Sequence, residues 1–362
     1  MTRWSTRGST TEKQGPGVIS GDPEEEIVDL SVIVSPVDFT VSGEAALRRA
    51  LALARQHEAA LHVVYVRPGR AGRNASGPTA EDPYLGRLVK FITSLNPEGV
   101  AVTPVVLTGE PVKAVAEYAR MNSADLVVVG QNGRRASRFW ASGVLATDVA
   151  RAVGSPTLTV SNKAVADTDV AAPFNNVLCA IDFSPASLRA LDEALTIAQA
   201  SGGRVTLLHV LEGFPYETVY SGSRALRLID EYGVRAEKVR RELRALVPLD
   251  ALNWCEVETE VVSGIAHDAI TAIATARKAD LVVIGRPHRS RLDRIVMAST
   301  LSGVLRRARC PVLSVPGPLS VTDAASRAIV ADRDEDKAFA RLTQGGTHGL
   351  EPRNLTVGLE AL

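Results

Sequence analysis

The sequence has little that would tie it to an oxidising compartment, a membrane or a nucleic acid. Its three cysteines are an odd number, lie far apart and show no C-x-x-C spacing, which argues against disulfides and a cysteine-based zinc site. Lys+Arg and Asp+Glu both total 41, so no net charge steers the chain toward nucleic acid. Apolar runs are of strand length, and residues 1–26 contain no signal-peptide core. These absences predict a soluble cytoplasmic protein without a metal site.

The sequence also lacks the usual signatures of P-loop nucleotide hydrolases and of other hydrolytic enzymes. No glycine loop ends in the Lys-Ser/Thr pair of a P-loop. No Ser–His–Asp order, second carboxylate or metal cluster accompanies Asp38 or Asp182, the acidic residues that end two expected strands. A binding protein is therefore favoured over an enzyme.

An internal repeat determines the expected architecture, because four segments recur in the same order. The pairs are 37–40 with 181–184 (offset 144), 61–64 with 208–211 (147), 123–133 with 278–288 (155), and 155–160 with 310–315 (155). The growing offset places insertions in loops between strands, where they are tolerated. This alignment puts His62 and His209 at equivalent strand positions.

Each copy is expected to alternate apolar strands with helices. In the first copy, strands are expected at 30–37, 61–66, 102–107, 125–129 and 157–160, and helices at 42–56, 83–95, 112–121 and 141–153. The strands are continuously rich in Val, Leu and Ile, as parallel strands covered on both faces are. In the second copy, Ser184-Pro185 has the residue types of a helix start, a capping hydroxyl followed by proline. The pattern predicts a doubly wound α/β sheet in each copy.

Ligands of such sheets bind beyond the carboxyl ends of the strands, where the strand order reverses. Asp38 and Asp182 end the first strand of each copy, and a glycine-containing loop follows the fourth, from Gly130 and from Gly285. Glycines let backbone N–H groups approach an anion closely, and the loop leads to a helix N-terminus that favours phosphate. An aspartate beside this loop could accept hydrogen bonds from ribose hydroxyls or hold a metal ion.

These segments resemble the motifs of universal stress proteins over residues 28–162 and 174–316. The resemblance rests on SPVDFT, LHV, Gly109-Glu110-Pro111 and Gly130-x2-Gly133-x9-Gly143. It implies two tandem Rossmann-like domains of the adenine nucleotide alpha hydrolase-like type, each with a parallel sheet of order 3-2-1-4-5. It also implies that the fifth strands, 157–160 and 312–315, pair antiparallel and make each chain a pseudo-dimer.

The resemblance further implies ATP binding, since the loop cradles phosphates in nucleotide-binding members and the early Asp and the second-strand Val meet the nucleoside. In the first copy the matching residues are Asp38, Val63, Gly130, Gly133 and Gly143. In the second copy the matching residues are Asp182, Val210, Gly285 and Ser299.

Both copies depart from the family's loop pattern. Val144 replaces a phosphate-binding hydroxyl in the first copy, whereas His288 and Ala298 replace two glycines in the second, which keeps the hydroxyls of Ser299 and Thr300. A lost neutral hydrogen bond costs about 0.5–1.5 kcal/mol, but a β-carbon against a phosphate can exclude the ligand. The first copy is therefore predicted to bind ATP, with or without Mg²⁺, and the second to be degenerate.

The loop arginines have two interpretations, whereas the histidines, Trp140 and two cysteines are expected to have structural roles. The loop arginines either support phosphates or lie in solvated loops and salt bridges: Arg134, Arg135, Arg138, Arg286, Arg289, Arg291 and Arg294. His62 and His209 are expected to be satisfied core or strand-end residues. Trp140, Cys179 and Cys310 are expected to serve packing.

Outside the two copies, residues 1–27 are expected to be disordered, 163–173 to form a linker, and 317–362 to form a loose tail that includes at most one helix near 324–342. The expected function is a stress-response regulator for which nucleotide is a conformational or assembly signal, with homodimers and an unidentified protein partner. The alternatives are a nucleotide-independent scaffold, a stress protein that binds another small ligand, and a slow ATPase.

Overall fold

The computed structural model describes residues 30–67, 82–131, 144–161, 172–212, 223–286 and 296–318. The expectations for both termini, most of the linker, Trp140 and the loop arginines other than Arg286 fall outside these residues. Gly133, Gly143 and His288 fall outside them as well, and for Ser299 only the helical backbone is described. None of the described helices is long and apolar enough to span a bilayer.

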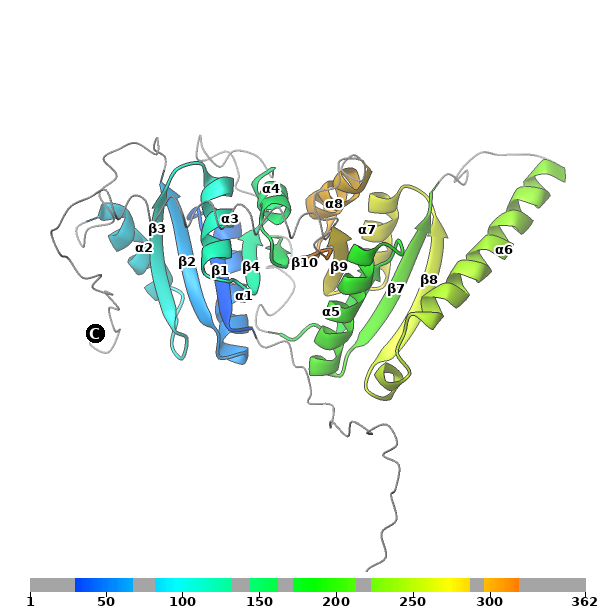
Figure 1. Ribbon diagram of the computed structural model, residues 1–362, viewed down its shortest axis with the longest axis horizontal. Helices are drawn as coiled ribbons and strands as arrows, with labels where there is room; N and C mark the ends of the chain where they lie inside the picture. Colours follow the sequence, from blue (N-terminus) through cyan, green and yellow to red (C-terminus); the bar gives the residue numbers. More distant parts are fainter. Residues whose placement is uncertain are drawn as a thin grey trace, which may run out of the picture.

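The described chain forms one ten-stranded sheet in the order β3-β2-β1-β4-β5-β10-β9-β6-β7-β8 (Figure 1). Each half therefore has the strand order 3-2-1-4-5, which confirms the predicted pair of doubly wound repeats. The strands are β1 Val32–Pro36, β2 Ala60–Arg67, β3 Val102–Thr108, β4 Leu126–Gly130, β5 Thr157–Val160, β6 Asn176–Ala180, β7 Arg204–Leu211, β8 Glu256–Ser263, β9 Leu281–Arg286 and β10 Val312–Pro316.

The helices alternate with these strands. They are α1 Val41–Gln56, α2 Pro83–Thr93, α3 Pro111–Met121, α4 Val144–Ala152, α5 Pro185–Ser201, α6 Ser223–Ala245, α7 Ala266–Ala276 and α8 Val296–Arg307, with a 3-10 turn at Asp250–Asn253. Ser184 caps α5, because its hydroxyl accepts a hydrogen bond from Ser187 N at 3.2 Å and Pro185 follows it. The predicted start of this helix is confirmed.

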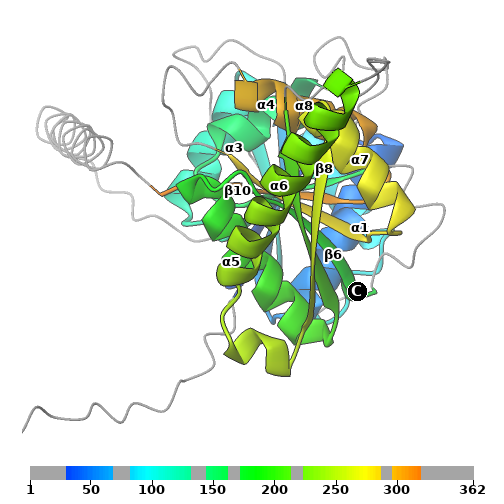
Figure 2. The same ribbon diagram turned by 90° about the vertical axis from the view of Figure 1, so that its right-hand side faces the viewer.

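Two helical layers cover the sheet. One continuous core lies beneath α1, α2, α5 and α6 and extends through both repeats. On the other face, α3 and α4 cover one cluster and α7 and α8 cover another. The long helix α6 lies beside the edge strand β8, at the end of the molecule that faces the viewer in Figure 2. The two repeats therefore share a hydrophobic core on one face of the sheet.

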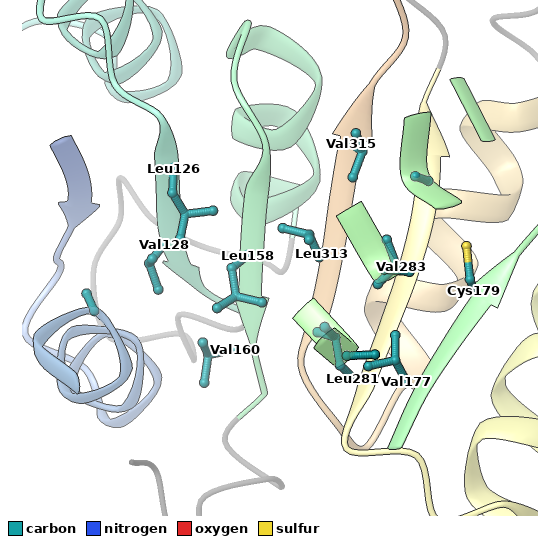
Figure 3. Packing of buried hydrophobic residues seen from close by; sticks show 14 of the residues in the cluster. Leu126, Val128, Leu158, Val160, Val177, Cys179, Leu281, Val283, Leu313 and Val315 are labelled. Atoms are coloured by element: carbon teal, nitrogen blue, oxygen red, sulfur yellow. The ribbon is translucent and has the colours of Figure 1, made fainter. Parts of the chain in front are cut away.

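The fifth strands join the repeats. β5 and β10 pair antiparallel, with Leu158 opposite Leu313, and both side chains are almost fully buried. Figure 3 shows these two leucines on the adjacent strands of the joint. The antiparallel pairing implied by the family resemblance is confirmed, and it relates the two repeats as the halves of a pseudo-dimer.

The structure corrects the alignment of the second strands. Val37 N donates to Val64 O at 2.9 Å, and in the second repeat Ile181 N donates to Leu208 O at 2.8 Å. The strands β2 and β7 therefore correspond at an offset of 144 residues, as the first strands do, and the predicted offset of 147 is wrong. An odd shift turns every side chain to the opposite face of a strand, so the difference changes which residues can meet a ligand.

In the corrected register, Tyr65 corresponds to His209 and Val66 corresponds to Val210. His62 corresponds to Thr206, so the two histidines are not equivalent. The shared letters Leu-His-Val misled the alignment because both strands consist mainly of Val and Leu, and a short match among such residues fits several registers.

Candidate functional site

The carboxyl ends of β1, β2 and β4 meet where the order of the first repeat reverses. Asp38 follows β1, Val66 lies near the end of β2, and Gly130 ends β4. β1 pairs with both β2 and β4, so these residues lie along one edge of the sheet. The second repeat places Asp182, Val210 and Gly285 in the same way. This edge is where open α/β sheets bind ligands.

A strained turn follows β1 in the first repeat. Asp38 Oδ1 accepts hydrogen bonds from Thr40 N at 3.0 Å and from the Thr40 hydroxyl at 2.5 Å. The intervening Phe39 has φ +58°, which is an outlier for a bulky side chain. Within the described residues, Asp38 Oδ2 accepts no hydrogen bond, whereas Oδ1 is held by the turn.

The second repeat has the same turn. Asp182 Oδ1 accepts from Ser184 N at 3.0 Å and from the Ser184 hydroxyl at 2.6 Å, and Phe183 has φ +64°. Strained backbone is retained mainly where function or tightly packed surroundings require it. Its presence in both repeats marks the Asp-Phe turn as a constrained part of the site.

Gly130 and Gly285 are required by the packing of a helix start on a strand end. A β-carbon on Gly130 would lie 2.4 Å from Ser42 O, and one on Gly285 would lie 2.4 Å from the carbonyl carbon of Ala186. Real β-carbons do not approach backbone atoms so closely. The glycine at each position is therefore explained by the approach of α1 to β4 and of α5 to β9, whether or not a phosphate binds.

In the first repeat, the corrected register puts Val66, and not the predicted Val63, at the position equivalent to Val210. Val63 is fully buried in the core beneath α1, so its side chain has no access to the sheet edge. Val66, the counterpart of Val210, lies three residues closer to the end of β2 and faces the α3 side. A nucleoside at the carboxyl end of β2 would therefore meet the backbone near Val66.

The surroundings of the strained phenylalanine differ between the repeats. In the first repeat, Phe39 packs on Tyr65 and Phe91, with ring centroids 4.9 and 5.3 Å away, and the Arg87 guanidinium lies 4.1 Å above its ring. In the second repeat, Phe183 contacts His209 at 5.2 Å beside a groove of about 700 Å³ under α6. Among the described residues, the first repeat therefore surrounds its Asp-Phe turn with more aromatic contacts than the second.

The histidines have partners in the fold, as expected. His62 Nδ1 is hydrogen-bonded to the Tyr118 hydroxyl at 3.0 Å, and burial lowers the pKa of this imidazole. His209 Nδ1 lies 2.7 Å from Ile181 O and donates to it. The interpretation of both as satisfied core or strand-end residues is confirmed.

The cysteines fill apolar space. Cys179 is fully buried and Cys310 is half-buried against the core beneath α7 and α8. Burial raises the pKa of the Cys179 thiol, and that of Cys310 to about 12. Both thiols are therefore kept protonated. In the described ranges, no group of three or more His, Cys, Asp and Glu side chains is placed to hold a metal ion.

Arg286 does not support a phosphate in its own repeat. Its Nη2 donates to Val153 O at 2.6 Å and to Ser155 O at 3.1 Å, at the carboxyl end of α4 in the other repeat. The side chain is 6% exposed, and burial lowers its pKa to about 10. The prediction that this arginine supports phosphates, or lies in a solvated loop or a salt bridge, is corrected: it donates hydrogen bonds that join the two repeats.

Gln131 makes the reciprocal contact. It follows Gly130 as Arg286 follows Gly285, and its side-chain amide donates to Leu305 O in α8 of the second repeat. Each repeat thus sends one buried polar side chain from the end of its fourth strand to the last helix of the other. Sequence reasoning missed this pair, because nothing in one repeat indicates that a loop residue will bind the other.

Comparison with known proteins agrees with this architecture. A family model described as the universal stress protein family matches residues 29–161 and again residues 173–316. The chain belongs to the universal stress protein family. A universal stress protein of Methanocaldococcus jannaschii is 30% identical over 149 residues, which are 40% of this chain and 84% of that protein.

Other relatives extend the comparison. A universal stress protein of Thermus aquaticus is 33% identical over 148 residues, 39% of this chain and 98% of that protein. The crystal structure of a universal stress protein from Archaeoglobus fulgidus superposes with a TM-score of 0.53 at 18% identity, covering 80% of this chain and 97% of that one. This structure shares the fold with the tandem universal stress protein described above.

Proposed function

We propose that this universal stress protein binds an adenine nucleotide, ATP with or without Mg²⁺, at the carboxyl edge of its first repeat. The observation that carries the proposal is the Asp38-Phe39 turn beside the switch point of the sheet, in which Thr40 donates two hydrogen bonds to Asp38 Oδ1 and no described residue donates to Oδ2. A carboxylate there can accept hydrogen bonds from ribose hydroxyls. The predicted phosphate contacts at Gly130, Gly133 and Gly143 complete the site.

The corrected register refines the nucleoside contact. Val63 was the predicted contact, but Val66 occupies the position that corresponds to Val210. The proposed site in the first repeat therefore uses the backbone at Val66 beside Asp38, not the buried Val63 side chain. Val210 keeps its proposed place in the second repeat together with Asp182, Gly285 and Ser299.

The second repeat is proposed to be the weaker site. Its loop has His288 and Ala298 where the family's nucleotide-binding loop has glycine. Arg286, a cation close to that loop in sequence, is bonded to the other repeat and is not available to a phosphate. Nucleotide would then act as a conformational or assembly signal in a cytoplasmic regulator that forms homodimers.

Asp38→Asn and Asp182→Asn test this assignment as a matched pair. Asparagine keeps an oxygen that can accept the hydrogen bonds of the turn, so each variant removes the charge with little change to the backbone. Hydrogen bonds to a charged group contribute about 1.5–3 kcal/mol, so Asp38→Asn should weaken ATP binding about tenfold or more. Asp182→Asn should leave it unchanged, as measured by equilibrium dialysis with labelled ATP.

The same dialysis separates the alternative functions. A loss with Asp182→Asn but not with Asp38→Asn would place the site in the second repeat and contradict the proposal. If both variants bound ATP with the affinity of the wild type, the switch point of the sheet would not be the nucleotide site. ADP release from the same samples, abolished by Asp38→Asn, would instead indicate a slow ATPase.

A further inference from the structure

Both ends of the phosphate loop predicted for the first repeat are attached to the second repeat. The loop lies between β4 and α4, and α4 contacts α8 of the second repeat (Figure 1). At the start of the loop, the Gln131 side chain donates to Leu305 O in α8. Beyond its end, Arg286 donates to Val153 O and Ser155 O, directly after α4. The second repeat thus holds both the strand end before the loop and the helix after it.

Gln131 is held from two directions. Its backbone N–H donates to Val160 O in β5 at 2.8 Å, whereas its side-chain amide reaches the last turn of α8 in the other repeat. The last four carbonyls of a helix have no partner within it, so this amide satisfies a group that α8 leaves open. Gln131 is 5% exposed, so little water can replace the bond if the amide is removed. Gly130, the first predicted phosphate contact, directly precedes this anchored residue.

Arg286 fixes the helix that follows the loop. Its two hydrogen bonds, 2.6 and 3.1 Å long, end at the turn after α4, and a cation near the C-terminal end of a helix also interacts favourably with the helix dipole. The helix α4 has nine residues and is therefore roughly 14 Å long. Because so short a helix moves as one unit, the position of its first turn depends on where its last turn is held.

A third contact across the joint differs in being exposed to solvent. Arg151 Nη2 of α4 donates to the Ser302 hydroxyl of α8 at 2.7 Å. This contact joins the same two helices, but water can replace it on both sides. It therefore offers a matched control for the two buried contacts.

We propose that Gln131 and Arg286 are positioning residues for ATP in the first repeat, so that the second repeat supports the site that the first repeat uses. This inference rests on the proposed nucleotide function. Neither side chain contacts the ligand: Gln131 fixes the strand end where the loop starts, and Arg286 fixes the helix where it ends. Their loss weakens the phosphate contacts and leaves the nucleoside contacts at Asp38 and at the Val66 backbone in place.

ATP and adenosine are the probes for this inference, titrated calorimetrically into the full-length wild type, Gln131→Met and Arg286→Ala. Methionine has nearly the length and volume of glutamine but cannot donate a hydrogen bond. In both variants, ATP affinity should fall by at least about fivefold, the lower end of the usual coupling between sites. Adenosine affinity should keep its wild-type value, because adenosine has no phosphate. Residues that only stabilised the fold would change both affinities or neither.

Two further variants complete the test. Arg286→Gln retains a donor and should recover most of the ATP affinity that Arg286→Ala loses, whereas Ser302→Ala should bind ATP as the wild type does. Unchanged ATP affinity in Gln131→Met and Arg286→Ala, an equal loss of adenosine affinity, or an equal loss in Ser302→Ala would overturn this inference alone. If the wild type bound neither ATP nor adenosine, the nucleotide proposal would fail and this inference with it.

Discussion

We expect Gly130→Ala to destabilise the protein by about 3 kcal/mol, the upper end of the usual cost of overpacking a core. The added β-carbon would lie 2.4 Å from Ser42 O and 2.5 Å from Ser42 C, which are backbone atoms at the start of α1. They cannot move without displacing the helix from β4. Urea unfolding followed by circular dichroism measures the change in the free energy of unfolding.

Gly86→Ala is the matched control for this prediction. Gly86 lies inside α2, where an added β-carbon would meet nothing within 4 Å. Alanine is favoured over glycine in a helix by about 1 kcal/mol, so this variant should be slightly more stable than the wild type. If Gly130→Ala were as stable as Gly86→Ala, the close approach of α1 to β4 would be wrong.

Arg286→Ala is expected to cost about 3 kcal/mol and to weaken the joint between the repeats. The variant removes two hydrogen bonds from a charged donor, each of which contributes about 1.5–3 kcal/mol, and leaves the carbonyls of Val153 and Ser155 without this donor. The cost is reduced because the wild type pays to bury the guanidinium, as its lowered pKa indicates. Chemical denaturation of the full chain measures the loss.

Arg286→Gln is the informative companion variant, since it installs the residue that the first repeat already uses at the equivalent position, Gln131. A glutamine amide can still donate to the end of α4, so the loss should be below about 1 kcal/mol. Equal losses for Arg286→Ala and Arg286→Gln would contradict the view that a side-chain hydrogen bond from this position to the end of α4 holds the two repeats together.

Most of the fold could be predicted from the sequence, because the relevant signals are repeated and local. Continuous apolar strands alternate with helices in both copies, and the capping signal at Ser184-Pro185 is a property of neighbouring residues. The strand order and the antiparallel pairing of β5 with β10 followed from the family resemblance. Pattern alone does not specify which strand ends become neighbours.

The parts that could not be predicted depend on contacts between distant residues. The register of β2 and β7 was missed because Leu-His-Val recurs at an offset that the hydrogen bonds of β1 and β6 exclude. The glycine loop was interpreted through phosphate binding, whereas Gly130 and Gly285 are already required by helix packing. The role of Arg286 depends on a helix about 130 residues earlier in the chain.

The proposed nucleotide site and the joint between the repeats meet at the carboxyl end of β4. The nucleotide site lies at the carboxyl ends of β1, β2 and β4, within one repeat. Gln131 and Arg286 connect the end of each fourth strand to the other repeat. The tandem arrangement thus provides a joint that neither repeat has alone.

The central claim is that the first repeat binds adenine nucleotide, and calorimetric titration of ATP with Mg²⁺ into nucleotide-stripped protein tests it most directly. The account predicts a single site per chain, lost or weakened in Asp38→Asn. Two sites of similar affinity would show that His288 and Ala298 do not impair the second repeat. No heat, together with no thermal stabilisation at high ATP concentration, would contradict the claim and favour a nucleotide-independent scaffold.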